Sequence, residues 1–224
     1  HISISNLADA RLRMKLHHAN KVQRPDLVLR LPLQRITTWS QNAQVAVNGF
    51  TWAGDRGFLP GQYGLPLGHV FNPIYAGIGT RLLGGNLTTG GACNDFVYVP
   101  GYICNSSSPS GGNKRIAAWP QVGSNFLWRE TSSVGALFDL ANPNYFYISS
   151  STSVIKNGVC SGDLLTDRFS AVAFTSNGRV VVLSSTSDST TNAPQMCEIF
   201  KALGVSNAIR LDGASATGMT VDGV

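Results

Sequence analysis

Residues 169–185 constrain the fold of this chain more than any other stretch. They read FSAVAFTSNGRVVVLSS, two apolar runs rich in β-branched residues that are joined through Ser-Asn-Gly. Runs of this composition on either side of such a turn predict a β-hairpin. An antiparallel sheet is therefore expected in the second half of the chain.

A helix is predicted directly after this hairpin. Asn192 is a good N-cap, Pro194 fits the first turn, and Gln195 lies three residues after the cap, as in a capping box. Four apolar residues are spaced for one buried face: Met196, Ile199, Phe200 and Leu203. Gly204 is expected to end the helix. The segment NAIRL then predicts a strand that delivers Asp212 at its end.

Further elements are expected elsewhere in the chain. Alternating leucines predict a strand at 27–34, and residues 36–47 predict a helical turn followed by a buried strand. Two more apolar runs predict strands at 145–149 and 153–159. Residues 1–24 are compatible with either a short helix or a leading strand.

Residues 53–125 form the least regular part of the sequence and hold most of the glycine and proline. Two stretches in it, 84–94 and 104–114, are not expected to form regular secondary structure. A loop-rich insertion of this length is usually functional, as a lid or a binding surface. Because no repeat or clear linker is found, the sequence predicts one α+β domain over 1–224. We expect a mixed β-sheet with few packed helices and long irregular loops.

The charge balance gives a first indication of partners. With 17 basic and 12 acidic residues the net charge is +5, which favours an anionic partner such as a phosphoglycan, nucleic acid or anionic lipid. An ordinary basic protein without a charge-driven function fits equally well. Nucleic acid is not favoured, because the basic residues near the start lack interleaved aromatic residues. No stretch approaches the ~20 apolar residues of a membrane span.

The cysteines and the first residue bear on location. The four cysteines are Cys93, Cys104, Cys160 and Cys197, and none forms a C-x-x-C pair. Cys93 and Cys104 bracket a Gly/Asn/Ser-rich segment that a disulfide would staple, whereas four unpaired thiols are the alternative. We expect at least one disulfide and a secreted or otherwise extracytoplasmic location. The chain starts at His1 without a signal peptide, which indicates a processed product or an excised domain.

Several enzyme classes have no support in the sequence. It contains no H-E-x-x-H, no His/Cys cluster with metal spacing, no G-x-S-x-G, no P-loop and no G-x-G-x-x-G. Zinc hydrolases, serine-triad hydrolases and P-loop NTPases are therefore not indicated. No cofactor is expected, and a divalent metal is left open.

The segment 192–223 resembles the signature region of the phosphodiester glycosidases. In that family an amphipathic helix leads into Asn-Ala-Ile/Leu-x-Leu-Asp-Gly-Gly-Gly-Ser, and here the stretch reads MCEIFKALGVSNAIRLDGASATGMTVDG. Two further pieces fit in the same order, AVNGFTW at 46–52 and DRFSAVAFTSNGRVVVL at 167–183. The resemblance covers roughly 27–52 and 145–224. It implies a hydrolase that cleaves a glycosyl phosphodiester.

Three residues are candidates for catalysis through this resemblance. Asp212 would stabilise or attack an oxocarbenium-like centre, or activate water, and the alternative is an ordinary turn aspartate. Arg168 would hold a phosphate in a bidentate fork, unless it forms an ion pair with Asp167 or another carboxylate. Glu198, on the helix, would supply a second carboxylate, and the alternative is a solvated helix residue.

Five residues are expected to contact the substrate: Asn48, Gly49, Gly213, Ser215 and Thr217. Asn48 would hydrogen-bond sugar or phosphate while Gly49 allows close approach, unless the pair only ends a strand. Ser215 and Thr217 would donate to phosphate oxygens, the alternative being packing of small residues. The family's glycine run is shortened here, because Ala214 follows Gly213.

The resemblance predicts a substrate class, and two other functions remain open. The expected substrate is a sugar-1-phosphate linkage in a phosphoglycan or similar anionic glycoconjugate, for which a basic protein is suited. A non-catalytic phosphoglycan-binding module is the second interpretation. The third is a secreted toxin or phage-associated effector domain that acts on envelope glycan or nucleic acid.

Overall fold

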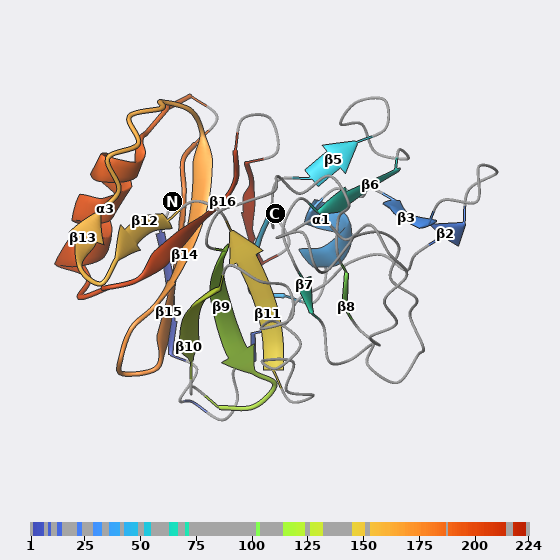
Figure 1. Cartoon of the computed structure of the whole chain (residues 1–224), viewed down its shortest axis with the longest axis horizontal. Helices are drawn as coiled ribbons and strands as arrows, with labels where there is room; N and C mark the ends of the chain where they lie inside the picture. Colours follow the sequence, from blue (N-terminus) through green and yellow to red (C-terminus); the bar gives the residue numbers. More distant parts are fainter. Residues whose placement is uncertain are drawn as a thin grey trace.

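The structure is a computed structural model of the chain (Figure 1). It describes residues 2–6, 9, 13–14, 22–23, 29–32, 36–40, 43–48, 52–54, 63–66, 70–71, 102–103, 114–123, 126–131, 145–150, 153–186, 188–213 and 217–222. The expected disulfide between Cys93 and Cys104 lies outside these residues, as do 84–94 and nearly all of 104–114.

A six-stranded sheet forms the centre of the fold, in the order β1-β15-β14-β16-β12-β13. Its strands are β1 (Ile2–Asn6), β12 (Ser153–Lys156), β13 (Val159–Cys160), β14 (Phe169–Phe174), β15 (Arg179–Ser184) and β16 (Ala208–Gly213). Each neighbouring pair is antiparallel. The hairpin predicted at 169–185 is confirmed as β14–β15. Residues 2–6 form a leading strand, which pairs with β15.

A second sheet of five strands has the order β10-β9-β11-β7-β8. Its strands are β7 (Val70–Phe71), β8 (Tyr102–Ile103), β9 (Lys114–Pro120), β10 (Leu127–Thr131) and β11 (Tyr145–Ser150). The strand expected at 145–149 is confirmed as β11. The region 53–125 is more regular than expected, because β9 lies between β10 and β11 and buries Ala117, Ala118 and Trp119.

Two smaller sheets complete the described strands. One has the order β2-β3-β6-β5, built from β2 (Val22–Gln23), β3 (Leu29–Pro32), β5 (Trp52–Gly54) and β6 (Tyr63–Pro66). The other pairs β4 (Val45–Val47) with β17 (Met219–Val221). The strand predicted at 27–34 is confirmed as β3. The turn and strand predicted at 36–47 are confirmed as helix α1 (Ile36–Trp39) and β4.

Helix α3 (Ala193–Ala202) begins and ends as predicted. Asn192 caps it, with a complete capping box to Gln195, and Gly204 follows the helix with a φ of +74°. The predicted buried face is wrong in part, because Ile199 is 41% exposed. The buried face consists of Ala193, Met196, Cys197 and Phe200. The buried face differs from the expected one because it includes Cys197, which is directed towards β13 by its disulfide with Cys160.

The central sheet is covered on both faces. Alternate side chains of β14 divide between two buried clusters: Ala171 and Ala173 pack with Met196 and Phe200 of α3, whereas Val172 and Phe174 pack towards the five-stranded sheet. Figure 1 shows α3 at the left of the molecule and the sheet of β2, β3, β5 and β6 at the right. The described part of the fold is thus mainly sheet with two helices, which agrees with the α+β expectation only in part.

Candidate functional site

A bulge between β14 and β16 shapes the end of the central sheet. Phe169 pairs with Gly213 and Ala171 pairs with Arg210, so two steps along β14 match three steps along β16. A bulge bends a strand and re-aims the side chains beside it, and bulges are frequent next to active sites. Asp212 lies within this irregular segment, and Arg168 directly precedes the first residue of β14.

Asp212 is half-buried and is the second-to-last residue of β16, which extends to Gly213. The sequence had predicted it at the end of this strand. Its carboxylate Oδ1 accepts a hydrogen bond of 2.9 Å from the main-chain N–H of Gly213. Its main-chain carbonyl accepts one of 3.1 Å from the side chain of Asn48. Both contacts fix the backbone from which the Asp212 carboxylate projects.

The amide of Asn48 joins segments that are distant in the sequence. Its Oδ1 accepts from the Ser170 hydroxyl at 2.7 Å and from the Gly218 N–H at 3.1 Å, while Nδ2 donates to the Asp212 carbonyl. Ser184 Oγ lies 3.2 Å from Ser170 Oγ, but the single Ser170 proton is committed to the shorter contact with Asn48. The predicted substrate ligand Asn48 thus holds β14, β16 and the segment before β17 together.

Arg168 is half-buried at the head of β14. Its main-chain N–H donates to Asp167 Oδ1 at 2.7 Å, and its carbonyl accepts from Thr217 Oγ1 at 3.0 Å. Thr217 therefore contacts the backbone of Arg168 with the hydroxyl that was expected to face phosphate. Within the described ranges no ion pair of the Arg168 guanidinium is found, so the alternative pairing with Asp167 is not seen there.

Gly213 is required for close packing. A Cβ at this position would lie 2.7 Å from the Arg168 carbonyl oxygen and 2.8 Å from Cδ1 of Phe169. The φ of Gly213 does not lie in the left-handed region, so backbone freedom is not the reason for glycine here. The absence of a side chain instead allows β16 to approach the start of β14.

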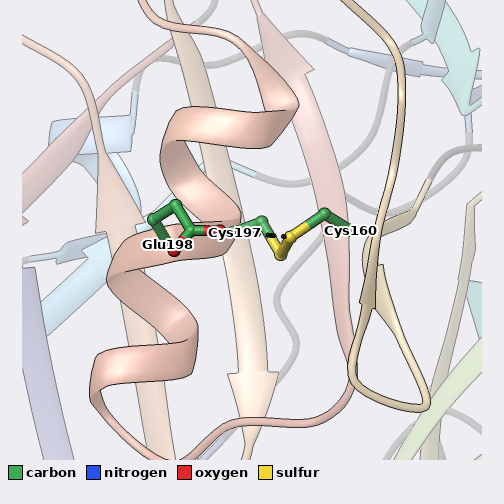
Figure 2. Close-up of side chains that lie close together, drawn as sticks. All are labelled: Cys160, Cys197 and Glu198. Atoms are coloured by element: carbon green, nitrogen blue, oxygen red, sulfur yellow. Dashed lines mark hydrogen bonds between the residues drawn. A yellow bond between two sulfur atoms is a disulfide. The ribbon is translucent and has the colours of Figure 1, made fainter.

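Glu198 is not brought to this cluster. Figure 2 shows it beside the Cys160–Cys197 disulfide, and its side chain is 73% exposed with Lys201 Nζ at 3.7 Å. Its Oε1 lies 3.6 Å from Cys160 Sγ, a close contact and not a hydrogen bond because a disulfide sulfur carries no proton. Cys160 belongs to β13, which is separated from the strand of Asp212 by β12.

The same three residues bring potential metal-ligand atoms close together. The donor atoms of Cys160, Cys197 and Glu198 all lie within 4.8 Å of one another. Both sulfurs are consumed by the disulfide, so they are not available as thiolate ligands. The disulfide confirms the expectation of at least one such bond. It suits an oxidising compartment.

Two predicted contact residues, Gly49 and Ser215, lie outside the described residues, as does Ala214. Sequence reasoning missed two residues that the structure places at this end of the sheet. Arg210 stacks on Phe169 with its Cζ 4.4 Å from the ring centroid, and its Nη1 lies 3.0 Å from Asp163 Oδ2. An arginine inside the apolar strand NAIRL was the available signal.

No helix among the described residues has the length and apolar character that a membrane crossing needs.

A search of curated proteins finds no match. Among solved structures, the chain is similar to a putative exported protein from Burkholderia pseudomallei, with a TM-score of 0.48 and 12% identity over 86% of this chain and 64% of that one.

Two further solved structures are similar to this chain. One is a hypothetical protein from Synechocystis, with a TM-score of 0.45 and 15% identity over 99% of this chain. The chain spans about half of that protein's length, 53%. The other is the zebrafish N-acetylglucosamine-1-phosphodiester alpha-N-acetylglucosaminidase catalytic domain, auto-inhibited by its pro-peptide. Its TM-score is 0.43 and its identity 15%, over 98% of this chain and 90% of that one.

The comparison with protein families covers the residues that build the cluster described above. The phosphodiester glycosidase family matches residues 41–224, which include Asn48, Arg168, Asp212 and Thr217. Because the match covers most of the chain, it is sufficient to assign the chain to this family. The protein belongs to the phosphodiester glycosidase family.

Proposed function

We propose that this chain hydrolyses a glycosyl phosphodiester, releasing a sugar from a sugar-1-phosphate linkage in a phosphoglycan or similar anionic glycoconjugate. One observation carries the proposal. The bulge between β14 and β16 brings the backbone of Arg168 and the segment of Asp212 and Gly213 together, with a Cβ on Gly213 reaching 2.7 Å from the Arg168 carbonyl. Arg168 and Asp212 therefore lie on adjoining segments, and the proposed reaction needs both a cation and a carboxylate.

Arg168 is assigned to the phosphate group. A guanidinium presents several N–H donors in a planar fork that matches phosphate oxygens, and it remains charged at any physiological pH. Its main chain is held by Thr217 and Asp167, so the side chain starts from a fixed point. A phosphate that is bound by a cation is a good leaving group, which lowers the need for a strong general acid.

Asp212 is assigned to the anomeric carbon. As the bond from that carbon to the phosphate oxygen breaks, positive charge develops on the sugar ring, and a carboxylate nearby stabilises it. Water then adds to the anomeric carbon and loses a proton, so the products are a free sugar and a phosphomonoester. Glu198, on the exposed side of α3, receives no role in this scheme.

The setting of the protein fits this assignment. The net charge of +5 favours association with a polyanionic glycan. The Cys160–Cys197 disulfide supports an extracytoplasmic location, because such bonds persist in oxidising compartments. The scheme uses only this chain's residues and water, and it requires no cofactor.

A substrate panel tests the proposal. The chain is incubated with sugar 1-phosphodiesters that differ in the sugar and in the alcohol, and free sugar and phosphomonoester are measured together. Equimolar release of both products, unchanged by a metal chelator, is expected. Binding of these compounds without release of either product would instead identify a non-catalytic phosphoglycan-binding module. Activity that appears only after addition of a divalent metal would contradict the cofactor-free scheme.

A further inference from the structure

We propose that Arg210 is a positioning residue that holds Phe169, and through it the phosphate-binding Arg168, in the geometry needed for the reaction. This inference rests on the proposed function. Neither Arg210 nor Asp163 is placed in contact with the substrate. Their effect is on the conformation of the residue that is.

The first observation is a stack on a buried ring. The Arg210 guanidinium lies over Phe169, with Cζ 4.4 Å from the ring centroid, and the Phe169 side chain is only 3% exposed. Arg210 pairs with Ala171, the residue two positions after Phe169, so the arginine is the diagonal neighbour of the ring. The small side chain of Ala171 leaves this diagonal open. A cation over a desolvated aromatic face is attracted to it more strongly than at an exposed site.

The second observation is an ion pair that orients the guanidinium. Arg210 Nη1 lies 3.0 Å from Asp163 Oδ2, and the two side chains are 20% and 34% exposed. The other carboxylate oxygen of Asp163 accepts from the Leu165 N–H at 3.0 Å. Asp163 therefore ties the segment that leads to Arg168 onto the strand of Arg210. The same guanidinium that pairs with Asp163 lies over the ring of Phe169.

The third observation is the close approach of Gly213 to the same ring. A Cβ on Gly213 would meet Phe169 Cδ1 at 2.8 Å and Cε1 at 3.0 Å, so the glycine leaves the space that the ring needs. The ring is thus contacted both by the guanidinium of Arg210 and by the backbone around Gly213. Since Phe169 is bonded to Arg168, a shift of this ring displaces the main chain from which the Arg168 side chain projects.

The chemistry explains why an arginine stands at position 210. A guanidinium is planar, so it can lie flat on a ring while its edge pairs with a carboxylate, whereas a lysine ammonium is a point charge. Lysine would retain the attraction to Asp163 and lose the flat stack. The substitution Arg210→Lys therefore keeps the positive charge at position 210 and removes the planar group, so it tests the contribution of the stack.

The test measures inorganic phosphate binding and sugar-phosphodiester hydrolysis in Arg210→Lys, Arg210→Gln, Asp163→Asn and the double variant. Arg179→Lys and Arg179→Gln are the matched controls, because Arg179 is exposed at the opposite end of the hairpin. We expect Arg210→Lys to weaken phosphate binding and kcat/KM by about tenfold, and Arg210→Gln to weaken them further, because displacement of a binding group is costly to catalysis. The Arg179 variants should remain within about twofold of wild type.

Two further readouts separate positioning from loss of the fold. Thermal unfolding should show every variant folded at the assay temperature, and amide hydrogen exchange at Phe169 and Gly213 should be faster in the Arg210 and Asp163 variants but not in the Arg179 variants. The double variant should lose no more activity than Arg210→Gln, because either substitution alone already removes the interaction between Arg210 and Asp163. If wild type binds phosphate and folded Arg210→Gln binds it with the same affinity, the inference about Arg210 is overturned and the proposed function is not. A wild-type chain that neither binds phosphate nor hydrolyses any phosphodiester would overturn the proposed function, and this inference with it.

Discussion

The side chain of Asn48 donates a hydrogen bond of 3.1 Å to the main-chain carbonyl of Asp212, across a separation of 164 residues. The same amide accepts protons from Ser170 and Gly218. One polar side chain after β4 therefore fixes the bulged end of β16, the start of β14 and the approach to β17. The candidate site is built on this connection.

Replacing Asn48 by alanine should strongly destabilise the protein. The substitution removes three hydrogen bonds and leaves the Gly218 N–H and the Asp212 carbonyl without this partner. We expect a loss of about 2–4 kcal/mol in the free energy of unfolding, measured by urea denaturation. Ser170→Ala, which removes one of the three bonds, should lose about 1 kcal/mol. Equal losses in the two variants would show that Asn48 is not the centre of the network.

Replacing Gly213 by alanine should also destabilise the protein, through overpacking. The new methyl group would lie 2.7 Å from the Arg168 carbonyl oxygen, so β14 and β16 must separate locally. The expected cost is about 1–3 kcal/mol. Gly162→Ala is the matched control, because a Cβ at Gly162 meets nothing within 4 Å. Thermal unfolding that ranks the two variants as equal would contradict the described packing.

Removal of the Cys160–Cys197 disulfide should cost the largest single amount. The bond closes a loop with a sequence separation of 37 residues, for which the chain-entropy relation gives about 4 kcal/mol. The variant Cys160→Ala/Cys197→Ala should show this loss in urea denaturation, and a reducing agent should lower the stability of wild type by more than that of the variant. Glu198→Gln should change stability by less than about 0.5 kcal/mol, because the Glu198–Lys201 pair is exposed. Insensitivity of wild type to reduction would contradict the disulfide.

The cap of α3 provides a smaller and more local prediction. Asn192→Ala removes the hydrogen bond from the Gln195 N–H to the Asn192 side chain and should cost about 1 kcal/mol. Asn192→Ser keeps an acceptor at the N-cap and should retain most of the stability. A larger effect for serine than for alanine would show that the capping box is not what stabilises this end.

Local patterns in the sequence predicted the elements that depend on local interactions. The hairpin of β14 and β15 and the start of α3 follow from turn and capping residues, so neighbouring residues were sufficient to locate them. The buried face of α3 was only partly predicted. Residues 193, 196, 197 and 200 are as periodic as the expected set, and the disulfide of Cys197 selected between the two.

Features that depend on distant partners could not be predicted in this way. Strand β9 lies in a glycine- and proline-rich region and is stabilised by pairing with β10 and β11. The partners of Asn48 lie 122, 164 and 170 residues away. No local pattern reports a bulge that a strand forms only when paired. The structural contacts of Asn48, Thr217 and Gly213 therefore had no local signal in the sequence, and the roles predicted for Arg168 and Asp212 stay predictions.

The measurement that tests the central claim most directly compares wild type with Asp212→Asn on a sugar 1-phosphodiester that wild type hydrolyses. Asparagine has nearly the same shape and keeps an acceptor for the Gly213 N–H, so the variant should unfold at the wild-type temperature. Its release of sugar and phosphomonoester should fall by about a hundredfold or more, because the charge that stabilises the transition state is gone. A folded Asp212→Asn variant that retains most of the wild-type rate would contradict the account.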